Sequence, residues 1–188
     1  MGTIGWIILG VIVATAIYVV FIYNRLVSLR QTVSQSWSDI SVQLKQRHDL
    51  IPNLVETVKG YAAHERGTLE AVVNARNAAI AASGPEAQAK AENMLTGALR
   101  QLFALAEAYP DLKANQNFLQ LQSELTDIEN KIAAARRFFN NAVQELNTAI
   151  QQFPAVLIAR QLGFQERQFF ELDEGEQVAA ATPPQVKF

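Results

Sequence analysis

The densest group of side chains able to do chemistry lies between residues 48 and 65. It combines two imidazoles, three carboxylates, an amide and an amine: His48, Asp49, Asn53, Glu56, Lys59, His64 and Glu65. Imidazoles and carboxylates are the usual ligands of zinc and the usual general acids and bases. The group is therefore the first candidate for a metal site, an acid–base site or a recognition surface.

The spacing within this group argues against enzyme chemistry. A zinc-binding helix carries two histidines four residues apart, whereas His48 and His64 are sixteen residues apart. No serine is spaced to act as a nucleophile with His48, and the chain has no cysteine. We expect no catalytic residue, no metal and no cofactor. Two other roles stay open, in which His48, Asp49 and Asn53 cap a turn at Pro52 or the group binds a partner protein.

The composition indicates an all-α protein. The chain has 188 residues, of which 49% are hydrophobic, enough for one domain with appendages. Lys and Arg number 16 against 18 for Asp and Glu, and no basic stripe with interleaved aromatics occurs, so we expect no nucleic-acid partner. Alternating Val, Ile and Thr runs are missing, while Ala, Leu, Gln and Glu dominate.

The run from Ile4 to Tyr23 carries no charged side chain. As a helix it would span roughly 30 Å, the thickness of the hydrocarbon core of a bilayer. A cleaved signal peptide is the alternative, but no Lys or Arg precedes the run, and we expect an uncleaved single-pass anchor at residues 4–23. Arg25 and Arg30 follow it, so the positive-inside rule predicts residues 1–3 outside and the rest in the cytoplasm.

Within this anchor, Gly10 and Ala14 form a small pair four residues apart. Such a pair would let two anchor helices approach closely. The chance occurrence of small residues in a membrane span is an equally good explanation.

The rest of the chain is predicted to form a mostly antiparallel four-helix bundle over residues 24–163. From Phe118 to Phe153, apolar residues recur in steps of three and four without a break, which is typical of a long coiled-coil-like helix that must pack on another. We predict helices at about 24–49, 52–82, 86–108, 112–152 and 155–162. Residues 164–172 would be an aromatic docking segment, and residues 173–188 an extended or disordered tail.

Pro52 is predicted to lie at a turn, because proline removes a backbone donor and a single helix from the membrane to Ala82 would run well over 100 Å. A kinked continuous helix is the alternative. It is favoured by an apolar seam that stays in phase across the proline, at Leu44, Arg47, Ile51, Leu54 and Val58.

Two further groups are candidates for contacts with other subunits or with the membrane surface. Arg136 and Arg137 flank seam residues, so their stems would cover the bundle while their charges face solvent or a carboxylate. Phe164, Phe169 and Phe170 would either close the core of the bundle itself or dock on a neighbouring subunit or the bilayer.

Four motifs in the chain resemble the LemA family. They are Trp37-Ser38-Asp39-Ile40, RHDLIPNLVETVKGYAAHE from Arg47 to Glu65, Tyr109-Pro110-Asp111-Leu112-Lys113-Ala114-Asn115 and Ala135-Arg136-Arg137-Phe138-Phe139-Asn140. The resemblance implies a bacterial membrane protein with one N-terminal span and a cytoplasmic helical bundle, and it implies no established activity. A magnetosome-associated branch of the family suggests a part in shaping membrane, and frequent gene neighbours that encode membrane metalloproteases suggest envelope quality control.

We therefore expect a non-enzymatic scaffold in the bacterial inner membrane that self-associates and organises the membrane or envelope proteins. The first alternative is an adaptor for a membrane protease, which would bind its partner through the residue 48–65 group. The alternative of another class is a metal-dependent or acid–base enzyme that uses the same group.

Overall fold

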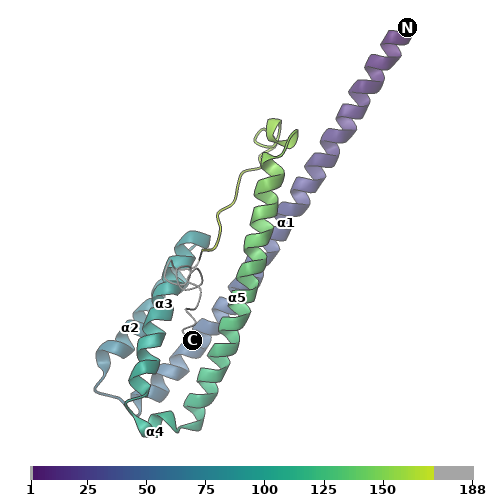
Figure 1. Ribbon diagram of the computed structural model, residues 1–188. Helices are drawn as coiled ribbons and strands as arrows, with labels where there is room; N and C mark the ends of the chain where they lie inside the picture. The colour runs from purple at the N-terminus through teal and green to yellow at the C-terminus, as the bar shows by residue number, and fades with distance from the viewer. Residues whose placement is uncertain (1, 172–188) are drawn as a thin grey trace, which may run out of the picture. The chain divides into compact units, whose positions relative to one another are not determined.

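The computed structural model describes residues 2–171, and their regular secondary structure is helical (Figure 1). The elements are α1 (Thr3–Lys59), α2 (Arg66–Ala81), α3 (Pro85–Ala106), α4 (Pro110–Lys113), α5 (Gln116–Gln151) and the short 3₁₀ helix η1 (Ala155–Leu157). The all-α prediction is confirmed. The tail predicted at residues 173–188 lies outside the described residues.

The chain divides into two compact units, which we call the two-helix unit and the four-helix unit. The two-helix unit contains residues 2–39 and 137–168, and the four-helix unit contains residues 40–136 and 169–171. Helices α1 and α5 each contribute one part to each unit.

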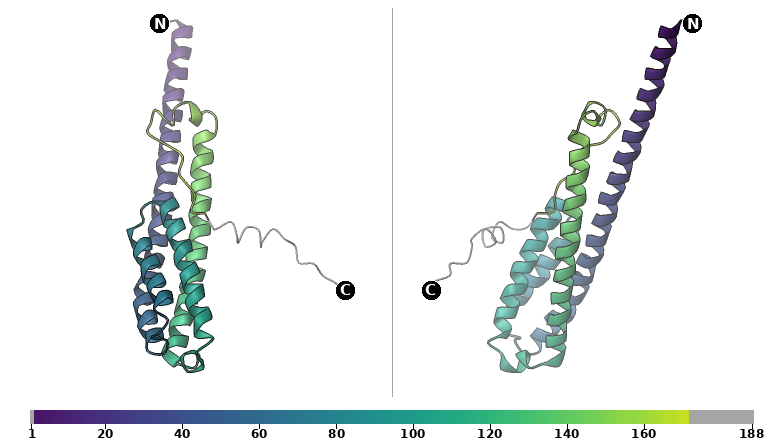
Figure 2. Two further views of the ribbon diagram at one scale, coloured as in Figure 1. Left: turned by 90° about the vertical axis from the view of Figure 1, so that its left-hand side faces the viewer. Right: turned by 45° about the vertical axis from the view of Figure 1, so that its right-hand side comes forward.

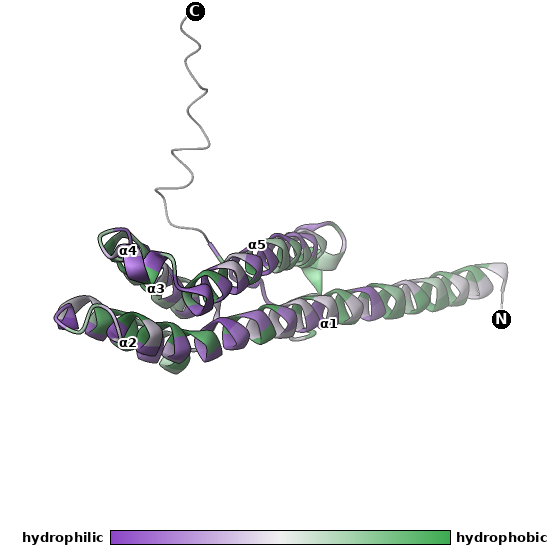
Figure 3. Cartoon of the chain, turned by 90° about the horizontal axis from the view of Figure 1, so that it is seen from below, coloured by the Kyte–Doolittle hydropathy of each residue, from purple (hydrophilic) through white to green (hydrophobic). Residues whose placement is uncertain are grey.

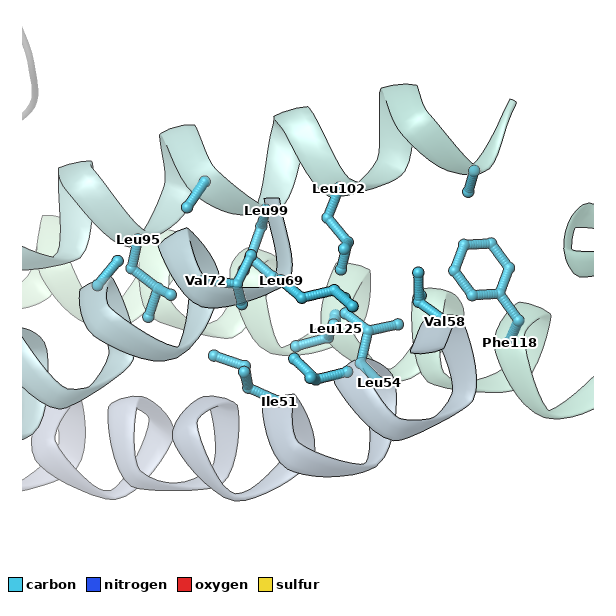
Figure 4. Close-up of a cluster of buried hydrophobic side chains, with 14 of the residues drawn as sticks. Ile51, Leu54, Val58, Leu69, Val72, Leu95, Leu99, Leu102, Phe118 and Leu125 are labelled. Carbon is cyan, nitrogen blue, oxygen red and sulfur yellow. The ribbon is translucent and has the colours of Figure 1, made fainter. Parts of the chain in front are cut away.

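In the four-helix unit, α1, α2, α3 and α5 alternate in direction, as short connections require (Figure 2). Each of these helices turns an apolar stripe inwards, and together the stripes form one buried core. Figure 4 shows its centre, formed by Ile51, Leu54, Val58, Leu69, Val72, Leu95, Leu99, Leu102, Phe118 and Leu125.

Local sequence signals explain where α3 and α5 begin. Gly84 has a positive φ of 85°, which L side chains rarely adopt, and Pro85 follows in the first turn of α3, where its missing N–H is no loss. Asn115 accepts a hydrogen bond from the backbone N–H of Phe118 at 3.0 Å through its Oδ1, so it caps α5. The helix predicted at 112–152 is therefore divided into α4 and a later-starting α5.

The predicted turn at Pro52 is wrong, because α1 continues through this residue to Lys59. A helical proline leaves the carbonyl four residues earlier without its N–H partner, here the carbonyl of His48. The Nε of Arg76 on α2 donates to that carbonyl at 2.7 Å, which replaces the missing bond. The helices predicted at 24–49 and 52–82 are thus one long helix and a shorter one, and the chain reverses at residues 60–65.

The two-helix unit pairs the first part of α1 with the second part of α5. The rings of Trp37 and Phe139 meet with centroids 5.3 Å apart, and Leu26, Val143 and Leu146 are buried along the pair. The seam predicted in α5 is covered by the chain itself through to residue 149, whereas residue 153, beyond the helix, is exposed. The helix predicted at 155–162 is only η1 followed by turns.

Among residues 2–171, α1 is the one helix long and apolar enough to cross a membrane. Its N-terminal part is mostly coloured hydrophobic in Figure 3, and its most apolar stretch is not covered by any other described part of the chain. Such a surface is unfavourable in water and suited to lipid. These features support the single-pass anchor predicted at residues 4–23.

The contact between Arg76 and the His48 carbonyl predicts a specific dependence on Pro52. Arg76→Met should lower the free energy of unfolding by about 1–3 kcal/mol, because it leaves a buried carbonyl without a donor. In a Pro52→Ala background the loss should be smaller, since residue 52 regains the N–H that bonds this carbonyl. Denaturant unfolding followed by circular dichroism measures both values.

The matched control is Arg66→Met, which changes an exposed arginine on the same helix. If Arg76→Met lowers the free energy of unfolding equally in both backgrounds, Arg76 does not replace the hydrogen bond that Pro52 removes from the His48 carbonyl.

Candidate functional site

Arg47 is the most unusual side chain of the four-helix unit, because it is only 2% exposed yet carries a full charge. On α1 it occupies a seam position between two buried apolar residues. Its Nη1 donates to Glu92 Oε2 at 2.8 Å, and its Nη2 lies 2.6 Å from Glu129 Oε1 and 2.8 Å from Thr96 Oγ1. One guanidinium therefore joins α1 to α3 and α5.

The second oxygen of Glu92 is also engaged. His48 Nε2 lies 2.7 Å from Glu92 Oε1, and the Gln88 amide donates to the same oxygen at 2.9 Å and to the carbonyl of Ala79 at 3.0 Å. An ionised carboxylate only accepts hydrogen bonds, so His48 Nε2 carries the hydrogen. Together with the bond from Arg76 to the His48 carbonyl, these contacts bring all four long helices into one polar network.

The two carboxyl groups beside Arg47 have opposite pKa shifts. Burial raises the pKa of Glu92, but the hydrogen bond from His48 and the charge of Arg47 outweigh it, and the net pKa is lowered. Burial also raises the pKa of Glu129, where the charge of Arg47 opposes the shift without reversing it. Both carboxyl groups pair with Arg47, and Glu129 is the one that takes up a proton more readily.

A cavity of about 510 Å³ lies beside this network. Its wall combines basic and acidic groups: Arg47, Arg100, Arg136, Glu92 and Glu129. The guanidinium of Arg136 lies 5.8 Å from the centre of the buried Phe170 ring, which also lines the cavity. The Nε of Arg47 is buried without a hydrogen-bond partner in the described part of the chain.

Two carboxyl groups with pKa values shifted apart can serve as an acid and a base in an enzyme. Here the oxygens of Glu92 accept from Arg47 and His48 of α1 and from Gln88 of its own helix, so this carboxylate is occupied by bonds within the bundle. Within residues 2–171, no three His, Asp or Glu side chains come together as a potential metal site. What the arrangement does is hold three helices to one charged centre.

The residues predicted from the 48–65 group do not converge. His48 points into the core, whereas Asp49 pairs with Lys45 at 3.0 Å on the surface and Glu56 pairs with Lys59 at 3.3 Å. Asn53 and His64 are exposed, and Glu65 accepts a hydrogen bond from Tyr109 at 3.2 Å. Capping of a turn at Pro52 is excluded because the helix continues there.

The three aromatic candidates, Phe164, Phe169 and Phe170, also do not form one site. Phe164 is buried in the two-helix unit, with its ring centre 5.7 Å from that of Tyr23 and 5.0 Å from the Arg30 guanidinium. Phe170 is buried in the four-helix unit, while Phe169 is 39% exposed. Phe164 and Phe170 therefore close the core of their own chain, which was one of the two predicted alternatives. Arg137 is exposed on α5, as are Gly10 and Ala14 on the apolar part of α1.

Sequence reasoning did not identify Glu92, Glu129, Gln88 or Arg76 as partners. A usable signal was nevertheless present, because a charged Arg47 occupied an apolar seam. Gln88 and Glu92, four residues apart, stand on the face of α3 that also carries buried alanines and leucines. Polar residues on a buried helix face require partners from other helices.

Comparison with known proteins gives consistent matches. The model of the LemA family matches residues 36–188, a range that contains Arg47, Glu92 and Glu129. The chain is 25% identical, over an alignment 187 positions long, to the magnetosome protein MamQ of Magnetospirillum gryphiswaldense, with 86% of this chain and 67% of that protein covered. It is 26% identical over 163 aligned residues to protein LemA of Metamycoplasma hominis, with 85% and 73% covered.

Removing one partner of the buried ion pair should destabilise the protein. Glu92→Gln keeps the shape of the side chain but removes the charge that faces Arg47, and it should lower the free energy of unfolding by about 3–5 kcal/mol. The control is Glu86→Gln on the same helix, where an exposed carboxylate pairs with Lys90, and its cost should be far smaller because solvent screens the pair. Similar losses in both variants would show that the burial of Glu92 has no energetic consequence.

The pKa shifts also predict how stability depends on pH. The lowered pKa of Glu92 means that its stabilising effect is present above the ordinary carboxyl pKa and is lost as the pH falls through the lowered pKa. The raised pKa of Glu129 acts oppositely, since folding is favoured as the pH falls through that raised pKa. Thermal midpoints measured against pH should fall less steeply in acid for Glu92→Gln than for the unmodified chain. If the thermal midpoints of the two proteins fall equally steeply in acid, the pKa of Glu92 is not lowered in the folded protein.

Proposed function

Because the chain belongs to the LemA family, we propose that it is a membrane-anchored, non-enzymatic helical scaffold that organises the membrane or envelope proteins. The observation that carries this proposal is the pairing of the charged side chains in the core. Arg47 and His48 of α1 both contact Glu92 of α3, at 2.8 and 2.7 Å, so the groups that could do chemistry hold the bundle together instead.

The anchor supports a function at a membrane. The apolar stretch of α1 is exposed and uncovered, and two arginines follow it directly. By the positive-inside rule the N-terminus faces outwards and the bundle lies in the cytoplasm, at the bacterial inner membrane. Relatives named as magnetosome proteins support a part in organising membrane.

Self-association is part of this proposal. The exposed face of the anchor helix supports it, whereas the seam of α5 does not. The long seam of α5 is covered by the chain's own helices and offers no face to a second copy. Gly10 and Ala14, in contrast, are exposed on α1, and no atom lies near the position that a side chain on Gly10 would take. A second anchor helix can approach closely along such a face.

An adaptor role for a membrane protease is the second candidate, and one feature favours it. Asp49, Asn53 and Glu56 are exposed at positions i, i+4 and i+7 of α1, so they form a polar strip on one face of the helix. A strip of this kind, in a helix that is attached to the membrane anchor, offers a recognition surface to another envelope protein.

Self-association can be tested by native mass spectrometry of the full chain extracted in mild detergent. We expect more than one copy per particle at micromolar concentration. Gly10→Leu should weaken the assembly because its side chain fills the space that lets two anchor helices approach closely. Ile12→Leu, which changes an exposed residue on the opposite side of the anchor helix, should leave the assembly intact. A clean monomer of the unmodified chain would refute self-association.

The adaptor role predicts a different experimental result from self-association. Replacing Asp49, Asn53 and Glu56 together by alanine should remove a co-purifying envelope protein without changing the copy number. If partners are retained and the assembly is lost, the strip is a contact between copies, and the adaptor role is wrong.

A further inference from the structure

The segment that follows α5 exposes large apolar side chains. We call residues 152–163 the tip segment; it contains η1 and the turns that lead to Gly163. Ala155 and Ala159 are buried on its inner side. Its outward side carries Phe153, Val156, Leu157 and Leu162, of which Phe153 is 80% and Leu157 62% exposed. Scattered apolar residues are normal on a surface, but a cluster within one short segment indicates a contact site.

The tip segment lies against the end of the apolar anchor, within the two-helix unit. A small depression is lined from one side by Tyr18, Phe21 and Ile22 of α1 and from the other by Phe153, Pro154 and Ala155. Tyr18 stands five residues, or about 7 Å, before the end of the uncharged run. The exposed patch is therefore continuous with the part of α1 that leaves the hydrocarbon core.

The backbone of the tip segment is suited to an environment with little water. The amides of residues 156–159 and 162–164 all donate to carbonyls of residues 152–160, at 2.8–3.1 Å. A segment that enters lipid has to satisfy its amides internally, because the surroundings offer no partners. Most of the amides of the tip segment meet this condition.

The charges near the tip segment suit the headgroup region. No acidic residue occurs between Glu145 and Glu166. Arg160 is exposed on the tip segment, and Arg25 of α1 lines the same depression as Phe153. Arginines next to an interfacial apolar patch attract the phosphates of anionic lipids.

We propose that the tip segment is a second membrane-contact site, which inserts Phe153, Val156, Leu157 and Leu162 into the interface of the bilayer that holds the anchor. Its partner is the lipid surface, with anionic headgroups beside Arg25 and Arg160. Amphipathic segments with apolar and basic groups enter this boundary to a depth of about 5–10 Å. The second contact fixes the rotation of the two-helix unit about the anchor axis, which a single helix cannot do. This inference requires the anchor but does not depend on self-association.

The test uses the absence of cysteine from the chain, which makes any introduced cysteine the sole labelling site. Leu157→Cys and Phe153→Cys are spin-labelled in the full-length chain, which is reconstituted into vesicles of phosphatidylcholine and phosphatidylglycerol. The control is Phe138→Cys, an exposed apolar position, 57% accessible, on α5 in the same unit. It lies fifteen residues, roughly 22 Å of helix, from Phe153. Since all three side chains are exposed, labelling removes no core contact, and circular dichroism verifies the fold.

The measurement compares collisions of each label with oxygen, which concentrates in lipid, and with a water-soluble nickel chelate. We expect the ratio of oxygen to nickel accessibility to be several-fold higher at residues 153 and 157 than at residue 138. Equal nickel accessibility at all three positions would place the tip segment in water and overturn the proposal. Low accessibility to both reagents, relieved by dilution with unlabelled chain, would identify a second copy as the cover and would also overturn it.

Discussion

A guanidinium buried among apolar helices must be neutralised by groups that other helices bring to it. Arg47 meets this requirement with Glu92 and Thr96 from α3 and Glu129 from α5. Because an unpaired buried charge costs several kcal/mol, helices packed in a shifted register would leave Arg47 or Glu92 without a partner. We infer that this network selects one arrangement of the four-helix unit, a task that apolar contacts alone perform poorly.

The same region of α1 resolves the conflict that a proline creates in a long helix. Pro52 frees the carbonyl of His48, whose side chain contacts Glu92, and Arg76 supplies the missing hydrogen bond from α2. The helix can therefore pass through the core without a turn. Most of the charged and polar groups at this level bond to one another and to the backbone, and these bonds hold the helices together.

The sequence predicted the elements that depend on local patterns and missed those that depend on contacts between helices. Composition, periodicity and the special geometry of Gly and Pro predict the uncharged run at 4–23, the seam of α5 and the break between the helices expected at 52–82 and 86–108. The in-phase seam across Pro52 indicates a continuous helix, whereas the length of an unsupported rod favours a turn. In the structure α1 is supported in each unit, by α5 in one and by α2, α3 and α5 in the other.

The polar network around Arg47 could not be predicted from local sequence patterns, because it depends on how separate helices pack. Nothing in the local sequence around Glu92 or Glu129 shows that each faces Arg47, because that depends on the register of three helices. His48 was prominent as a titratable group, but periodicity alone does not show which of its neighbours share its face with a partner helix. The charged residue at a seam position was the one local sign of the network.

A double-mutant cycle between Arg47 and Glu92 tests the central claim most directly. The free energies of unfolding of Arg47→Met, Glu92→Met and the double variant give the coupling between the two side chains, independent of what each loses alone. We expect the double variant to be more stable, by about 1–3 kcal/mol, than the sum of the two single losses would make it. Strictly additive losses would mean that the two charges do not stabilise one another, and the buried pair would not be what sets the register of the helices.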